Sequence, residues 1–187
     1  MSGFTIPYLD GSLSISRASR TFPQYLIFKP GMTITAVLLC FYWYKNNILI
    51  NHFKNTKSKK NNFMVFGVLS AFFLFTHSIL LGLETDIKIF KFIRRVILLG
   101  FIVFEIIAQS LLVADFYRLK KKIKNYFKSN ILRLKILLVS VLIFVAVISI
   151  PLLIMGGNVH FKHGLEWNYF IGVILFYLLT SFFWKKI

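Results

Sequence analysis

Two histidines and a glutamate stand three residues apart in the stretch HFKHGLEWN, residues 160–168. Imidazoles and carboxylates are zinc ligands, and they also carry general acid and base chemistry. On a helix, however, His160, His163 and Glu166 would spread over about 120° of arc, too wide for one shared metal ion. Glycines at 156, 157 and 164 also argue against a helix across the group. We therefore expect both histidines in a loop, Glu166-Trp167 at the start of a helix, no metal and no cofactor.

His77 and Glu105 are two further ionisable residues of interest, because each lies within an apolar run. An ionisable group at membrane depth is costly and marks a functional site by default. Consecutive antiparallel helices would bring the two together in the outer half of a membrane, with Gln109 one turn from Glu105 on the same face. The pair is either a functional site or a structural hydrogen-bonded contact, and the sequence leaves both interpretations open.

A polar N-terminal segment completes the candidate site. Two arginines beside a bilayer can clamp a lipid phosphate, whereas a solvated segment without a ligand is the alternative. The candidate polar or lipid-headgroup site therefore consists of Asp10, Arg17, Arg20, His77, Glu105, His160, His163 and Glu166. The chain has no G-x-S-x-G, H-E-x-x-H or P-loop motif, so none of these residues is predicted to be catalytic.

The elements that must position these residues are membrane helices. Hydrophobic residues make up 57% of the 187 residues, charged residues make up 16%, and there are 22 Phe. Mean hydropathy is +0.72. Five apolar stretches are long enough to cross a bilayer, at about 24–44, 62–83, 96–116, 136–155 and 165–184. We predict an all-α integral membrane protein, a bundle of five transmembrane helices, forming one domain over 1–187 with an outer polar segment at 1–23.

Basic residues are distributed unevenly between the two sides of these spans. Of the 23 Lys and Arg residues, 15 fall on the side of the 45–61 and 115–135 segments and the C-terminus, and eight on the other. This bias predicts an outside or lumenal N-terminus and a cytoplasmic C-terminus, and it explains the net charge of +17 without nucleic acid. The run FYRLKKKIKNYFK favours anionic headgroups on the cytoplasmic face, through Lys120, Lys121, Lys122 and Lys124, or it only signals topology.

Two stretches together resemble the Frag/DRAM/Sfk membrane protein family. IPYLDGSLSISRASRTFPQYLIF is similar to the first outer loop of that family, and HGLEWNYFIGVILFYLLTSFF is similar to its last helix, which opens with Glu-Trp. FEIIAQSLL is compatible with its fourth helix. The resemblance implies six helices, whereas this chain begins within the outer loop, so the first helix of the family is missing from the sequence. Arg94 and Arg95 lie where the family often has a histidine.

Members of that family are associated with autophagy, with remodelling of lipid anchors and with the organisation of membrane lipids. The resemblance therefore implies a non-enzymatic organiser or regulator of membrane lipids or membrane trafficking, with lipids as its partners. The alternative is a membrane-embedded lipid-modifying enzyme with a polar site at the outer leaflet, built from the candidate residues above. A transporter is disfavoured, because the sequence shows no inverted repeat and no pair of broken helices.

Overall fold

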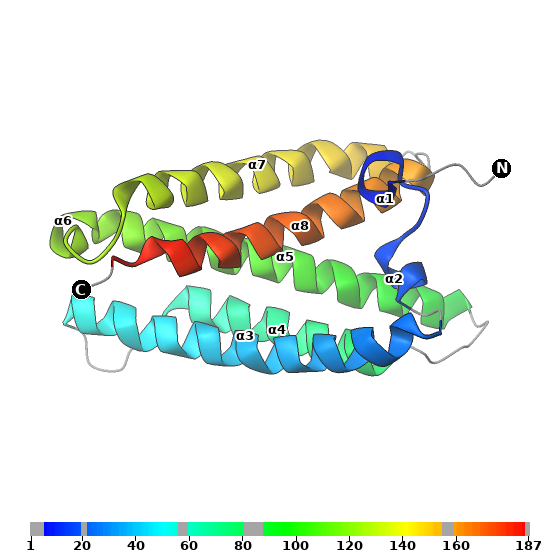
Figure 1. Ribbon diagram of the computed structural model, residues 1–187, viewed down its shortest axis with the longest axis horizontal. Coiled ribbons are helices and arrows are strands. Elements are labelled where there is room, and N and C mark those ends of the chain that lie inside the picture. The colour runs from blue at the N-terminus through cyan, green and yellow to red at the C-terminus, as the bar shows by residue number, and fades with distance from the viewer. Residues whose placement is uncertain (1–5, 20–21, 56–59, 81–87, 155–158, 186–187) are drawn as a thin grey trace.

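Five long helices run side by side through the molecule, and each is long and apolar enough to cross a membrane (Figure 1). The computed structural model describes residues 6–19, 22–55, 60–80, 88–154 and 159–185. Its long helices are α3 (Gln24–Lys54), α4 (Asn62–Leu80), α5 (Lys88–Arg118), α7 (Ser129–Ile154) and α8 (Val159–Phe183). The shortest, α4, spans about 28 Å, close to the thickness of the hydrocarbon core of a bilayer. The prediction of an all-α bundle with five transmembrane helices is confirmed.

The long helices leave most of their apolar side chains on the outside of the bundle. Between 17% and 39% of the residues in their most apolar stretches are buried inside it. Leu38, Phe72 and Phe144 are examples of large side chains that remain exposed. An apolar surface of this extent requires lipid around it. The chain is therefore a multi-pass integral membrane protein.

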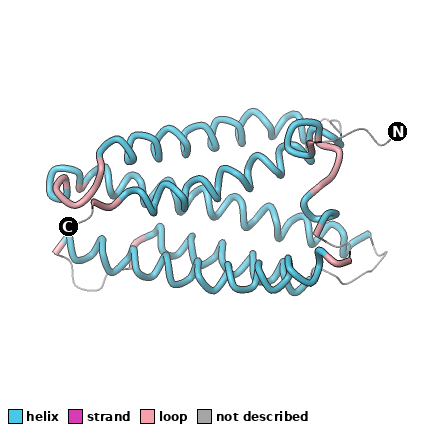
Figure 2. Tube along the Cα trace, viewed as in Figure 1, coloured by secondary structure: helices cyan, strands magenta, loops and turns pink. Residues whose placement is uncertain are grey.

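The long helices alternate in direction, which places the short elements at two ends of the bundle (Figure 1). The end where α3, α5 and α8 finish also carries α6 (Lys120–Ile123) and the C-terminus, and we call it the α6 end. At the opposite end, the α1 end, α1 (Pro7–Asp10) lies beside α8, and α2 (Ile15–Ala18) follows it. Figure 2 shows that helix dominates throughout, and the described ranges contain no strand.

Glycines allow close approach between neighbouring long helices. A Cβ at Gly67 on α4 would lie 2.2 Å from the Trp43 indole on α3. A Cβ at Gly172 on α8 would lie 2.6 Å from the Leu142 side chain on α7. Small residues at such contacts let membrane helices pack tightly. These contacts define how closely α4 approaches α3 and how closely α8 approaches α7.

Several helices extend beyond the apolar runs that predict them. α3 continues to Lys54, although its span is expected to end near residue 44, and α5 begins at Lys88, where residue 96 was expected. Hydropathy marks only the part of a helix that lies in hydrocarbon, and a helix can continue among polar headgroups. Polar contacts stabilise the last turns of α3: Asn61 Nδ2 donates to Oδ1 of Asn47 (2.8 Å) and of Asn51 (2.9 Å).

Candidate functional sites

Glu105 lies in the centre of a polar cluster formed by three helices. Its side chain is 0% exposed. The Ser70 hydroxyl on α4 donates to Glu105 Oε2 at 2.6 Å, and Gln109 Nε2, one turn away on α5, donates to Oε1 at 3.0 Å. The Tyr177 hydroxyl on α8 also donates to Oε1. The prediction that Glu105 faces protein, with Gln109 one turn away on the same face, is confirmed.

His77 is not at the level of Glu105, so the prediction that these two residues face each other is wrong. The α4 residue that reaches Glu105 is Ser70. His77 lies seven residues further along α4, about 10 Å closer to the α1 end. It is 4% exposed and therefore faces protein, as expected. The error arose because hydropathy does not give the depth of α4 relative to α5, which depends on how the two helices are connected and packed.

A second buried ionisable residue, Lys135 on α7, lies near this cluster. Lys135 is 1% exposed, and its Nζ donates to Thr180 Oγ1 at 2.7 Å and lies 4.0 Å from the centre of the Phe176 ring. Thr180 Oγ1 is also 3.4 Å from the Tyr42 hydroxyl, and the Tyr42 ring packs edge-on against Tyr177. Glu105 and Lys135 are therefore linked through side chains of α3 and α8, and both belong to one polar layer across the bundle.

Sequence reasoning missed Ser70, Tyr177 and Lys135 as parts of this layer. Serine and tyrosine are ordinary in membrane helices, so they give no signal in an apolar run. Lys135 was counted among the basic residues of the cytoplasmic side. The signal that could have found it is its position directly before the apolar run expected at 136–155, and the structure places Lys135 in the second turn of α7.

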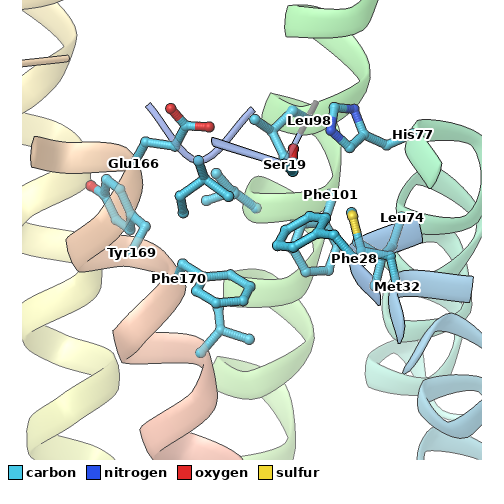
Figure 3. Close-up of a pocket in the computed structure, with 13 residues that line it drawn as sticks. Ser19, Phe28, Met32, Leu74, His77, Leu98, Phe101, Glu166, Tyr169 and Phe170 are labelled. Atoms are coloured by element: carbon cyan, nitrogen blue, oxygen red, sulfur yellow. The ribbon is translucent and has the colours of Figure 1, made fainter. Parts of the chain in front are cut away.

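A cavity lies between the long helices near the α1 end (Figure 3). Its walls come from α2, α3, α4, α5 and α8. His77 and Glu166 approach it from opposite sides, with Ser19 between them, whereas Phe101 and Phe170 line it at greater depth. Two of the eight predicted polar-site residues, His77 and Glu166, are thus brought to one cavity. Glu105 does not line it.

α8 begins at Val159, so the expectation that His160 and His163 lie in a loop and that Glu166-Trp167 opens the helix is wrong. A glycine inside a helix costs about 1 kcal/mol relative to alanine. Contacts with the N-terminal segment offset this cost at Gly164. His163 Nδ1 is 3.0 Å from the carbonyl oxygen of Gly11, and Trp167 Nε1 donates to the carbonyl of Leu13 at 2.8 Å.

Gly11 is required where α1 ends beside α8. Its φ is +62°, a backbone conformation that favours glycine, and a Cβ there would lie 1.7 Å from the carbonyl oxygen of His160. Asn168 Nδ2 adds a bond to the carbonyl of Tyr8 at 3.1 Å. His160 and His163 therefore contribute to docking of the N-terminal segment, and no group of three or more His, Cys, Asp or Glu among the described residues is placed to hold a metal.

Asp10 and Arg17 both lie in the docked N-terminal segment, and Arg20 lies outside the described residues. The carboxylate of Asp10 accepts the backbone N–H of Ser12 (2.8 Å) and of Ile6 (2.9 Å). These backbone donors, that of Ser12 first, lower the pKa of Asp10. Asp10 therefore stabilises the turn of α1, while the Arg17 side chain is exposed on α2. The structure brings neither of them to Glu105.

The four predicted lipid-contacting lysines lie together on and just after α6. Lys121, Lys122 and Lys124 are exposed and Lys120 is half-buried. Ile123 is buried between them and anchors α6 to the bundle. The following residues are held by backbone bonds to the end of α8, from Lys128 N to the Phe183 carbonyl (2.9 Å) and from Lys185 N to the Tyr126 carbonyl (3.0 Å).

No protein-family model, curated protein sequence or solved structure matches this chain.

Proposed function

We propose that this chain is a non-enzymatic membrane protein that organises or regulates membrane lipids, or membrane trafficking that depends on them, with its N-terminus outside or lumenal and its C-terminus in the cytoplasm. The observation that carries the proposal is the exposed basic surface at the α6 end. This surface consists of Lys120, Lys121, Lys122 and Lys124 together with Tyr117 and Tyr126, which are 59% and 45% exposed.

The composition of this surface suits the headgroup region of a cytoplasmic leaflet. Lysines near an anionic surface contribute about 1 kcal/mol each, and tyrosines collect at membrane interfaces. The backbone of this segment is hydrogen-bonded to the end of α8, and the buried side chains of Ile123 and Phe127 hold it against the bundle. The backbone that carries the lysines is therefore ordered before lipid binds. Less conformational entropy is then lost when lipids bind. The positive-inside rule supports the same orientation, and the buried position of Lys135 reduces the count on that side by one without reversing it.

The resemblance to the Frag/DRAM/Sfk family supports the same class of function. The two stretches that carry it lie against each other, because the N-terminal segment docks on the first turns of α8 through Trp167 and Asn168. The two stretches that carry the resemblance, although distant in the sequence, therefore form one contact.

The test measures which lipids co-purify with the chain. The variant replaces Lys120, Lys121, Lys122 and Lys124 by Gln, and four charges at about 1 kcal/mol each set an upper limit of about 4 kcal/mol on the loss. The matched control replaces Arg17, Lys29, Arg94 and Lys162 by Gln, which removes the same charge from the rest of the chain. Mass spectrometry of the extracted lipids should show anionic lipid depleted in the first variant alone. Equal depletion in both, or in neither, would remove the α6-end surface from the proposal.

One observation favours the second candidate, a lipid-modifying enzyme with a polar site at the outer leaflet. Ser19, His77 and Glu166, a hydroxyl, an imidazole and a carboxyl, line the same cavity (Figure 3). These side-chain types can supply a nucleophile and a general base. Incubation of the purified chain with phospholipid vesicles, followed by mass spectrometry, tests this candidate. Release of a fatty acid or headgroup that His77→Gln abolishes would establish the enzyme in place of the organiser.

A further inference from the structure

We propose that the first turns of α3 bind the headgroup of one phosphatidylethanolamine in the leaflet at the α1 end, with Lys29 and Tyr25 on its phosphate. The inference goes beyond the proposed function, which rests on lysines at the opposite end of the bundle. Phosphatidylethanolamine has no net charge, so loss of this site leaves the anionic lipid of the α6 end unchanged. Each of the two can therefore fail without the other.

An open hollow lies on the outside of the bundle, along one face of α3 near the α1 end. It has a volume of about 400 Å³, and its lining among the described residues consists of Tyr25, Leu26, Lys29, Pro30, Thr33 and Ile34. These positions recur at intervals of four residues, so they share one side of the helix. The hollow therefore offers a headgroup room against α3 without entry into the interior of the bundle.

Lys29 places a cation at the level of the first turns of α3. Side chains on a helix tilt toward its N-terminus, and Lys29 Nζ donates to the hydroxyl of Tyr25, one turn earlier, at 3.2 Å. The same Nζ lies 5.5 Å from the centre of the Tyr25 ring. Lysines that extend toward the membrane surface and tyrosines both collect at headgroup level. The ammonium and the hydroxyl are therefore held together at the depth of the lipid phosphates.

Within the described ranges, Lys29 forms no ion pair. The salt bridge found there joins Lys54 to Asp115 at the α6 end. A lysine ammonium has three donors, and Tyr25 accepts from one of them. The phenol that accepts this bond still has its own O–H to donate. A phosphate beside the two residues would accept charge-assisted hydrogen bonds from Lys29 and a further bond from Tyr25.

Pro30 leaves an acceptor for the other half of the headgroup. A proline has no N–H, so the carbonyl of Leu26 does not receive the helical bond that residue 30 would otherwise donate. Leu26 and Pro30 both line the hollow, and this carbonyl lies between them. An ethanolamine ammonium can donate to it, whereas the quaternary ammonium of choline has no N–H. Phosphatidylethanolamine should therefore bind more tightly than phosphatidylcholine.

The turn of α3 that carries the site is already fixed against α4. Thr33 Oγ1 donates to the carbonyl of Lys29 at 3.0 Å and lies 3.1 Å from the Ser78 hydroxyl on α4. Little backbone freedom is then lost when a headgroup binds. Exposed Ile34 and Leu38 continue along the same face of α3 toward the middle of the membrane, so the acyl chains stay in hydrocarbon while the headgroup is held.

Native mass spectrometry of the detergent-purified chain, titrated with phosphatidylethanolamine, tests the site. One lipid should bind more tightly than all others. Lys29→Gln should weaken this binding about tenfold, as expected for the loss of a charge-assisted hydrogen bond. Lys162→Gln, at a half-buried lysine near the same end, should leave it unchanged, as should the lysine variant of the α6 end. Unchanged binding in Lys29→Gln, or equal weakening in Lys162→Gln, would overturn the inference.

Two comparisons test the nature of the ligand. Pro30→Ala gives the Leu26 carbonyl a helical N–H and removes a proline from the helix interior, so it should fold well. The preference for phosphatidylethanolamine over phosphatidylcholine should disappear in this variant, while binding still depends on Lys29. A preference that survives Pro30→Ala, or that is absent from the native chain, would overturn the ammonium contact. Millimolar inorganic phosphate should not displace the lipid, and displacement would show that free phosphate is the ligand instead.

Discussion

The carboxyl group of Glu105 accepts hydrogen bonds from residues on three helices, so the loss of this acceptor should cost more than the loss of any one donor. Tyr177→Phe removes one donor and leaves the ring in place. Hydrogen bonds between membrane helices average about 0.6 kcal/mol and reach about 1.7 kcal/mol, so this substitution should lower the free energy of unfolding by an amount in that range.

Glu105→Leu should cost considerably more. Ser70 retains the Gly67 carbonyl as a partner at 2.8 Å, but Gln109 Nε2 and the Tyr177 hydroxyl both lose the acceptor they share. A buried donor without a partner costs about 1–3 kcal/mol, so two of them should cost about 2–6 kcal/mol. The expected order is therefore Glu105→Leu well above Tyr177→Phe, with Tyr44→Phe, at an exposed position of α3, near zero.

The assay is reversible unfolding of the chain in mixed micelles, followed by circular dichroism, with all three variants measured in the same detergent. Glu105→Gln separates a structural role from a functional one. A purely structural acceptor should tolerate Gln with a small loss of stability and unchanged lipid binding, whereas a functional site should lose lipid binding while stability barely moves. If Glu105→Leu proves no more costly than Tyr177→Phe, Glu105 is not the shared acceptor and the reasoning fails.

Three further predictions concern the ends of the bundle. In a Cys40→Ala background, a membrane-impermeant maleimide should label His160→Cys but not Lys60→Cys in intact cells, and the reverse pattern would invert the proposed topology. Asn61→Ala removes the side chain that bridges two residues of α3 and should cost about 1–3 kcal/mol in the same unfolding assay, whereas Asn125→Ala, at an exposed position, should cost almost nothing. The hydrogen bonds to the Asp10 carboxylate lower the pKa of Asp10, so they should stabilise α1 fully above about pH 4. This stability should be lost as the pH falls through the lowered pKa. Hydrogen exchange of the α1 amides should show this loss in the native chain and not in Asp10→Asn.

Much of the fold follows from hydropathy alone, and the reason is physical. A bilayer requires about 20 apolar residues per crossing, so five such runs predict five helices. The relation of Gln109 to Glu105 is equally local, because residues four apart share a helix face. Both predictions depend on distances within one helix, which the helical repeat determines.

The errors concern contacts between helices. The pairing of His77 with Glu105 failed because the depth of α4 relative to α5 depends on packing at residues such as Gly100 on α5, where a Cβ would lie 2.9 Å from the Phe73 ring on α4, and hydropathy does not register such contacts. The start of α8 was misplaced for a similar reason. His163 and Gly164 look like loop residues until the N-terminal segment, more than 150 residues away in sequence, contributes its hydrogen bonds.

Spin-label electron paramagnetic resonance of lipids around the reconstituted chain measures whether the α6-end lysines hold anionic lipid. The fraction of motionally restricted lipid is measured for spin-labelled phosphatidylserine and phosphatidylcholine, at low and high salt. We expect a larger restricted fraction for phosphatidylserine than for phosphatidylcholine. The difference should fall as salt screens the α6-end lysines, and it should disappear in the variant with Lys120, Lys121, Lys122 and Lys124 replaced by Gln. Equal fractions for both lipids in the native chain, or a preference that survives the substitution, would contradict this expectation.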